Sequence, residues 1–346
     1  MDFGFLFNNI VELSVSGLVL GAVYALIALG YTLVYGVLQL INFAHADVFM
    51  WGTFSVAWVF ILLGKTGNTS LMDIAIPLLI ALIVACAVTG VLAMAVERVA
   101  YRRLVRNGAP TYIILIAAIG ASFVLSETMG IRDLIVQLLN NVLNGILGIF
   151  GGSVDLVAFF APFTERARGI TTLPVTIQPT PLFSMGNFQL RDTDVVILVA
   201  ALGMMIGLDY FIRSTRLGRE IRAVAQDPEA AALMGSNSTS IVRTTFLIGG
   251  IMAGVAAVLY MIKVGATTFN VGTVLGVKAF TAAVLGGIGN LRGALLGGLL
   301  LGLAENYGAA VFGTQWKDVV AFVLLVLILL VRPTGLLGQS LGRARA

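Results

Sequence analysis

The sequence predicts an all-α protein, a polytopic bundle of transmembrane helices with about eight or nine membrane segments. Three observations indicate this fold class: 59% of the 346 residues are hydrophobic, only 11% are charged, and the mean hydropathy is +1.00. Soluble domains have about 25% charged residues, and the few charges present here cannot cover the surface of a soluble fold. Composition therefore excludes a water-soluble enzyme, a secreted domain and a disordered chain.

The long apolar stretches give the order of the expected membrane segments. A helix needs about 20 apolar residues to cross the hydrocarbon core of a bilayer. The apolar run over 10–63 is far too long for one crossing, so we expect it to fold back at the polar residues around Asn42. The stretch 271–289 is rich in glycine and has a central lysine, so it either crosses or forms a broken or re-entrant helix. The expected segments cover 10–38, 44–63, 73–96, 111–130, 193–212, 241–263, 271–289, 293–311 and 317–332.

Three arginine clusters orient these segments. Short cytoplasmic loops of membrane proteins are enriched in Lys and Arg. When all three clusters are placed in the cytoplasm, the nine segments put the N-terminus outside and the C-terminus in the cytoplasm. The same enrichment accounts for the net charge of +4, which therefore does not indicate a nucleic-acid partner. The clusters are Arg98, Arg102, Arg103 and Arg106; Arg213, Arg216, Arg219 and Arg222; and Arg332, Arg343 and Arg345.

Two segments outside the bilayer interrupt an otherwise single transmembrane domain over 1–346. Residues 131–192 are expected on the extracytoplasmic side. They begin with an apolar stretch whose depth in the membrane the sequence does not decide, and the alternation in LPVTIQP and NFQL predicts short strands. Residues 213–240 form the second segment, a loop on the cytoplasmic side that contains one of the arginine clusters.

The cytoplasmic loop contains a short helix with complete start and stop signals. Asp227 is a good N-cap, because its carboxylate can accept hydrogen bonds from the free amides of the first turn. Pro228 suits the first helical position, and Glu229 favours the positive end of the helix dipole. Gly235 can end the helix in the left-handed conformation. The helix is either an incidental part of the loop or a docking element for a cytoplasmic partner. The good helix formers between these signals are Ala230, Ala231, Ala232, Leu233 and Met234.

Polar residues at the first break form a second candidate site. Asn42, His45 and Asp47 follow one another between the first two membrane segments. Their ordinary interpretation is that Asn42 caps the next helix while the other two anchor it at the membrane interface. The functional alternative is a gate or a lining of a solute path, since polar groups at membrane depth are costly and are found along such paths.

A lysine inside an expected membrane segment needs a separate explanation. Lys278 lies within 271–289, where an ammonium group costs about 2.5–3.5 kcal/mol on insertion scales. It therefore needs a carboxylate, a carbonyl or water close by, and Glu127 and Glu305 are candidate partners. The lysine is either a structural tether or a part of a solute path.

Four motifs resemble segments of one family. RAVAQDPEAAALMG, which contains the short cytoplasmic helix, resembles the coupling-loop signature of ABC importer permeases. INFAHADVFMWGTF resembles a segment of the branched-chain amino acid importer permeases, and so do KAFTAAVLGGIGNLRGALLGGLLLGLAE (278–305) and WKDVVAFVLLVLILLVRPTGLLG (316–338). The matches run in order from about residue 10 to residue 338, they fit the LivH-type branch, and 131–192 matches least. Ala46 departs from the glycine expected in the family, which puts a tight backbone approach there in doubt.

The resemblance implies a permease subunit in the bacterial cytoplasmic (inner) membrane. It would pair with a second, LivM-like permease subunit, two ATP-binding subunits and an extracytoplasmic solute-binding protein, within membrane lipid. The sequence contains no GxxxxGK[ST] phosphate loop, so ATP chemistry would belong to the separate subunits and no cofactor is expected. The expected residues for coupling to the ATPase are Asp227, Pro228, Glu229, Ala230, Ala231, Leu233 and Gly235, and those for a gate are Asn42, His45, Asp47 and Lys278.

Glycines are concentrated near the C-terminal part of this match. The pairs Gly293/Gly297 and Gly298/Gly302 have the spacing of small residues that lets two membrane helices approach closely. This close packing occurs either within the chain or at the contact with the second permease subunit.

Other functions stay open at this stage. A permease of a related urea or short-amide importer shares the architecture, and an ion-coupled secondary transporter fits the composition and the buried charges without needing ATP-binding subunits. A membrane enzyme is the third class. It has little support, because the sequence has no clear nucleophile constellation or paired carboxylates, and its single histidine excludes a two-histidine metal motif.

Overall fold

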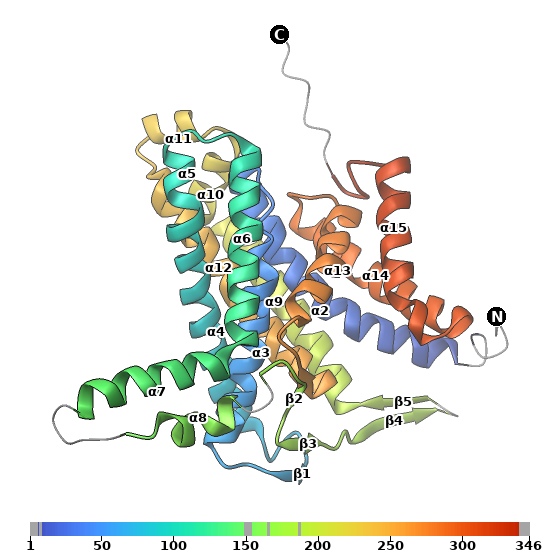
Figure 1. Cartoon of the computed structure of the whole chain (residues 1–346). Helices are drawn as coiled ribbons and strands as arrows, with labels where there is room; N and C mark the ends of the chain where they lie inside the picture. The colour runs from blue at the N-terminus through green and yellow to red at the C-terminus, as the bar shows by residue number, and fades with distance from the viewer. Residues whose placement is uncertain (1–5, 7–8, 149–153, 165–166, 186–187, 339–346) are drawn as a thin grey trace.

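The computed structural model of the chain, shown in Figure 1, describes residues 6, 9–148, 154–164, 167–185 and 188–338. Eight helices within these residues are long and apolar enough to cross a membrane, which confirms the predicted polytopic helical fold. They are α2 (Ile10–Leu38), α3 (Ala44–Leu62), α4 (Ala75–Val96), which continues through further helical turns to Arg106, α6 (Thr111–Gly130), α9 (Asp192–Ser214), α12 (Ser238–Val264), α14 (Leu291–Phe312) and α15 (Lys317–Val331), whose span begins with the preceding turn at Thr314.

Local signals explain where several of these helices end or change. The predicted break in 10–63 is confirmed, because Gln39 adopts a left-handed conformation (φ 54°) after α2 and the chain turns before α3. The helix α4 continues through a π-helical turn, Glu97–Tyr101, into α5 (Arg102–Arg106). A 3-10 turn, Thr314–Trp316, precedes α15.

Apart from α13, most elements outside the long helices gather at two opposite ends of the bundle in Figure 1. The α11 end carries α5, α10 (Arg216–Gln226) and α11 (Pro228–Leu233). The strand end carries α7 (Arg132–Gly148), α8 (Leu156–Thr164) and the short strands. Two arginine clusters therefore share the α11 end, whereas Arg343 and Arg345 lie outside the described residues. The orientation of these ends across a membrane stays a prediction.

The strands at the strand end join distant parts of the chain. The short strands expected in LPVTIQP and NFQL are confirmed as β3 and β5. β4 and β5 form an antiparallel hairpin, whereas the other pairs tie the segment after α8 to the ends of α3 and α12. The pairs are β1 (Gly67–Thr69) with β3 (Val175–Ile177) in parallel, β2 (Thr171–Thr172) with β6 (Ala266–Thr267) antiparallel, and β4 (Pro181–Met185) with β5 (Phe188–Arg191).

The apolar stretch that begins the 131–192 segment does not run along the bundle. Figure 1 shows α7 lying across the ends of α4 and α6. Its first residue, Arg132, is buried and donates to the carbonyls of Met129 (2.8 Å), Phe163 (2.8 Å) and Ala167 (2.6 Å). Burial lowers the pKa of the Arg132 guanidinium, an effect that the neighbouring Asp133 carboxylate opposes. One arginine thus fastens α6 to the chain on both sides of residues 165–166.

The stretch 271–289 forms a short helix rather than a full crossing. The helix α13 covers Val271–Gly286, 16 residues, or about 24 Å at about 1.5 Å per residue, against a hydrocarbon core of about 30 Å. It packs against α2, α3, α14 and α15, and most of its residues are buried. Where the sequence left a crossing and a broken or re-entrant helix open, the structure therefore has a shortened interior helix.

Close packing around α14 takes place within this chain. A Cβ atom at Gly21 would lie 2.7 Å from the carbonyl oxygen of Gly298, and one at Gly298 would lie 2.6 Å from the Cα of Ala25. Gly302 faces Gly17 in the same contact between α2 and α14. Because a side chain at these positions would hold the backbones apart, glycine is what permits the contact.

Candidate functional site

Asn42 joins the start of α3 to the end of α4. Its backbone carbonyl accepts the His45 amide at 3.1 Å, and its side-chain oxygen accepts the Tyr101 hydroxyl at 3.0 Å. The N-cap position of α3 is occupied by Phe43, and the Asn42 side-chain oxygen is used by Tyr101. Tyr101 was not identified from the sequence, because its partner lies 59 residues away.

His45 and Asp47 lie inside the chain, not at its surface. The His45 ring packs edge-on to Tyr31, with ring centroids 5.0 Å apart, and fills the space left by Gly30. Asp47 is fully buried and accepts a hydrogen bond from the Ser122 hydroxyl of α6. Neither residue fits the interpretation of an interfacial anchor.

The tight backbone approach that Ala46 put in doubt is present. It is provided by glycines of the facing helix α13: a Cβ at Gly272 would lie 2.8 Å from the Ala46 carbonyl oxygen and 2.6 Å from a carboxylate oxygen of Asp47. Gly276 faces the Ala46 side chain in the same way. The start of α3 and the start of α13 therefore form one closely packed crossing.

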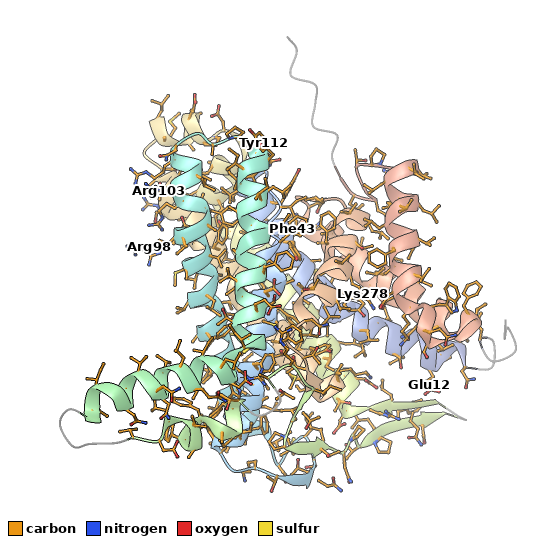
Figure 2. All side chains as sticks on the ribbon, in the orientation of Figure 1. Glu12, Phe43, Arg98, Arg103, Tyr112 and Lys278 are labelled. Atoms are coloured by element: carbon orange, nitrogen blue, oxygen red, sulfur yellow. The ribbon has the colours of Figure 1, made fainter. Side chains whose placement is uncertain are left out.

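Lys278 is held by two carboxylates. Its ammonium lies 2.8 Å from Glu305 of α14 and 2.7 Å from Asp318 of α15, and it stands over the ring of Tyr24. The Tyr24 hydroxyl donates to the other oxygen of Glu305 at 2.9 Å. Figure 2 shows Lys278 between α13 and the C-terminal helices. These contacts favour the structural-tether interpretation.

Of the two carboxylates that hold Lys278, only one was expected from the sequence. Glu305 is one of the two expected partners, whereas the other, Glu127, pairs instead with Arg168 at 2.8 Å. Asp318 was missed, although an acidic residue in the first turn of α15 was a visible signal. Within the described residues, no hydrogen bond or ion pair joins Lys278 to Asn42, His45 or Asp47, so the four candidates do not form one cluster.

The short helix α11 has the start signal that the sequence indicates. Asp227 accepts hydrogen bonds from the amides of Glu229 and Ala230, both at 2.9 Å, and Pro228 opens the helix. After the helix, Gly235 has a positive φ of 89°.

The exposed side chains of α11 are at its C-terminal tip. Ala231 is buried against its own chain, whereas Leu233 is 89% exposed and the following Met234 is 90% exposed. Met234 was not among the expected coupling residues. Two large apolar side chains held out beside the polar and basic α10 suit a contact with a partner, because apolar patches with polar surroundings mark interaction sites.

The helix α10 positions this tip. Thr215 caps it by accepting the Gly218 amide at 3.0 Å, and its apolar residues Ile221 and Val224 are buried. Asp227 both ends α10 and caps α11, so the two helices meet at a fixed corner.

Together, these features define a polytopic helical membrane protein with buried polar contacts around a short interior helix and an apolar tip at one end. Sequence comparisons identify the family. A family model described as the permease component of the branched-chain amino acid transport system matches residues 13–329, and the chain belongs to this family.

The chain is similar to several named relatives over nearly its whole length. It is 41% identical to the high-affinity branched-chain amino acid transport system permease protein BraD of Pseudomonas aeruginosa, over 94% of both chains. It is 40% identical to LivH of Escherichia coli K12, also over 94% of both. A probable LivH of Methanocaldococcus jannaschii is 25% identical over 90% of this chain and 88% of its own. No solved structure matches.

These findings confirm three expectations from the sequence. The resemblance to LivH-type permeases is correct, and the chain is a transport component rather than an enzyme. The eight apolar helices and the family together confirm a multi-pass protein of the bacterial cytoplasmic membrane. The roles of individual residues in coupling and in a gate stay predictions.

Proposed function

We propose that this chain is the permease subunit of an ATP-driven importer that, with a second permease subunit, forms the path for branched-chain amino acids. The observation that carries this proposal is the 40–41% identity, over 94% of both chains, to proteins named as high-affinity branched-chain amino acid transport permeases. Two ATP-binding subunits and an extracytoplasmic solute-binding protein complete the proposed assembly.

The proposed orientation places the α11 end in the cytoplasm and the strand end outside. It is supported by the arginines of α5 and α10, which share the α11 end. The strand end would then face the solute-binding protein. Thr176 is exposed in β3, so Thr176→Cys, in a chain with Cys86 replaced, should react with a membrane-impermeant reagent in intact cells. Reaction only after permeabilisation would contradict this orientation.

The proposed coupling element is the tip of α11. Its apolar side chains, Leu233 and Met234, would enter an apolar groove of an ATP-binding subunit, and the rigid corner at Asp227 would transmit the contact to α10. The buried Ala231 would support this element from the inside and would not itself make the contact.

The proposed solute path runs along the outer face of α13. Thr273 and Val274 are exposed there, Val277 and Phe280 are half-buried, and Phe43 packs against Phe280 with ring centroids 6.1 Å apart. This mostly apolar surface suits weak, transient binding of an apolar side chain, as conduction requires. The buried Asn42, His45 and Asp47 and the tethered Lys278 would set the position of α13 from behind.

Blocking this face tests the proposed path. Val274→Trp should abolish uptake, because the added ring would occupy the route. Val264→Trp is the matched control, since Val264 and Val274 are each 45% exposed but Val264 ends α12 near the strand end. Equal uptake by the two variants in complexes of equal abundance would contradict the path.

The function itself is tested by transport in liposomes. The complete complex is supplied with its binding protein on the extracytoplasmic side and with ATP on the side of the ATPase subunits. It should transport labelled leucine only when the binding protein and ATP are both present. Uptake driven by an ion gradient without ATP would establish the secondary-transporter alternative. Uptake of urea or a short amide in place of leucine would establish the related importer class.

Changes at the tip test coupling. Leu233→Asp combined with Met234→Asp should abolish leucine-stimulated ATP hydrolysis, because two carboxylates would have to enter an apolar groove. Leu217→Asp, at a 43% exposed apolar position on the neighbouring α10, is the control and should leave hydrolysis close to the wild-type level. Normal stimulation in the double variant would rule out the tip as the coupling contact.

A further inference from the structure

The outward face of α4 changes from apolar to basic along its length. Exposed residues recur every three or four positions from Ile76 to Ala95, and this face is formed by alanine, valine and isoleucine. The rise from Ile76 to Ala95 is about 29 Å at about 1.5 Å per residue, close to the about 30 Å of a hydrocarbon core. Arg98 follows within the next turn, at the depth where lipid headgroups begin. The exposed apolar positions are Ile76, Ile80, Ile83, Ala87, Val91 and Ala95.

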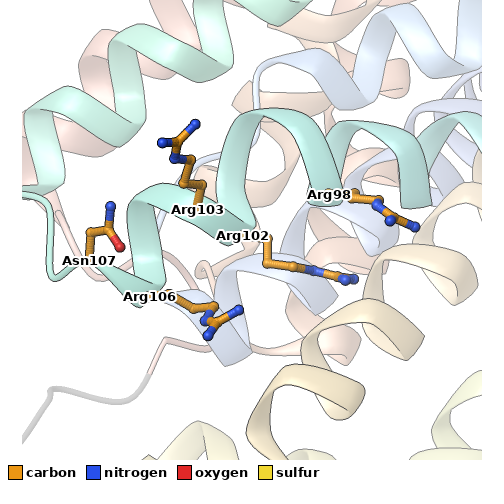
Figure 3. Close-up of a pocket in the computed structure, with 5 residues that line it drawn as sticks. All are labelled: Arg98, Arg102, Arg103, Arg106 and Asn107. Carbon is orange, nitrogen blue, oxygen red and sulfur yellow. The ribbon is translucent and has the colours of Figure 1, made fainter.

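The basic part of this face forms a pocket. Four arginines and Asn107 line a cavity of about 430 Å³ at the α11 end, a size within the about 300–1,000 Å³ of small-molecule sites. Figure 3 shows the side chains of Arg98, Arg102 and Arg106 leaving the helix on one side. Figure 2 shows Arg98 and Arg103 at the outer edge of the bundle, away from α13.

The charges of this pocket are largely unbalanced. Arg102 is held by the buried Glu97 through two hydrogen bonds, Nε to Oε1 at 2.9 Å and Nη2 to Oε2 at 2.6 Å. Within the part of the chain that the structure describes, Arg98, Arg103 and Arg106 have no ion pair and no side-chain hydrogen bond. One glutamate therefore stands against four arginines, and the pocket presents excess positive charge.

We propose that this pocket binds the phosphate of an anionic phospholipid headgroup, while the acyl chains of that lipid lie along the apolar face of α4. Guanidinium groups match phosphate oxygens in charge and in planar, two-bond geometry. The bidentate contact with Glu97 fixes Arg102 in place before the lipid arrives, so less side-chain freedom is lost on binding. The position of the pocket, directly beyond a membrane-length apolar stripe, favours a lipid over a soluble anion.

Native mass spectrometry of the intact transporter complex tests this proposal. The probes are dioleoylphosphatidylglycerol and dioleoylphosphatidylcholine, which carry the same acyl chains and differ in headgroup charge. The wild-type complex should retain the phosphatidylglycerol preferentially. Arg98→Gln with Arg106→Gln should weaken its binding about fivefold for each charge, or about twenty-fivefold together, and leave phosphatidylcholine unchanged.

A charge-matched control separates a site from general attraction. Arg222→Gln with Arg243→Gln removes two exposed charges at the same end of the molecule, on α10 and α12, and should leave phosphatidylglycerol binding at the wild-type level. Equal loss in this control would overturn the proposal, as would binding of inorganic phosphate as tight as that of phosphatidylglycerol, because the acyl chains would then contribute nothing. Loss of the ATP-binding subunits from the Arg98/Arg106 variant, with lipid binding unchanged, would show that the pocket docks a protein instead.

Discussion

The helices α13 and α11 differ in how the rest of the chain holds them. Around α13, Gly272 and Gly276 pack closely against α3 while Lys278 is tied to α14 and α15. The helix α11 is held by one capping aspartate and the buried Ala231, and it exposes its apolar tip. A substitution near α13 should therefore lower stability before it affects transport selectively, whereas a substitution in α11 should affect contact with a partner and leave global stability almost unchanged.

The largest stability loss is expected from Lys278→Met. It leaves Glu305, whose side chain is 2% exposed, without its countercharge, and breaking a buried pair in this way costs about 3–5 kcal/mol. The thermal unfolding midpoint of the purified protein measures the loss. Arg168→Met is the control, since the exposed Arg168–Glu127 pair contributes about 1 kcal/mol or less.

A second substitution sharpens this result. Adding Glu305→Gln to Lys278→Met should recover part of the lost stability, because the uncompensated carboxylate is removed. Midpoints that fall equally for Lys278→Met and Arg168→Met would contradict the structural role of the tether, and would return Lys278 to the candidates for a gate.

Gly21→Val should cost about 1–3 kcal/mol, since overpacking of a closely packed contact has this magnitude. Its side chain would meet the Gly298 carbonyl and separate α2 from α14. Gly203→Val in α9 is the matched control, because a Cβ there meets nothing within 4 Å. Unfolding in detergent, followed by circular dichroism, compares the two. A larger loss at Gly203 would contradict the described packing.

Tyr101→Phe should cost about 1 kcal/mol, the usual value of one hydrogen bond. The change removes the hydroxyl that binds Asn42 and keeps the edge-on ring contact with Phe246. The same unfolding measurement applies. Tyr112→Phe is the control and should leave the midpoint in place, because its ring is 62% exposed. A Tyr101→Phe variant as stable as Tyr112→Phe would show that the hydrogen bond to Asn42 does not contribute to the free energy of unfolding.

The smallest effect on global stability is expected from Asp227→Ala. Loss of an N-cap destabilises its own helix by about 0.5–2 kcal/mol, so the amides of Glu229 and Ala230 should exchange faster while the global midpoint stays constant. Asn237→Ala removes the corresponding cap of the crossing helix α12, where Asn237 accepts the Ser240 amide at 3.1 Å, and should lower the midpoint. If the unfolding midpoint falls in Asp227→Ala as well as in Asn237→Ala, α11 unfolds together with the bundle.

Features set by local chemistry could be predicted from the sequence. Membrane-length apolar runs placed the long helices, and the Asp-Pro-Glu sequence placed the start of α11 within a residue. The break near Asn42 followed from polar residues in an apolar run. Each of these signals lies within a few residues of the structure it specifies, so no knowledge of distant neighbours was needed.

Features set by distant partners could not be predicted in the same way. The buried face of α11 depends on what packs against it. The sequence therefore did not indicate that Ala231 is buried and Leu233 is exposed. The tie between Tyr101 and Asn42 joins two elements whose relative placement the sequence does not encode locally. The helix α13 ends just before Gly287, which has a positive φ of 106°, but the same stretch contains several other glycines, so its composition alone did not mark this end.

The π-helical turn at Glu97–Tyr101 can be understood as an insertion that the helix absorbed without breaking. A helix advances about 100° per residue, so one extra residue in a regular helix would rotate everything beyond it by about that angle. A π-helical turn is wider and takes up most of this rotation locally. The arginines of α5 therefore keep the direction they would have without the extra residue, and this end of the chain gains length without turning its charge away.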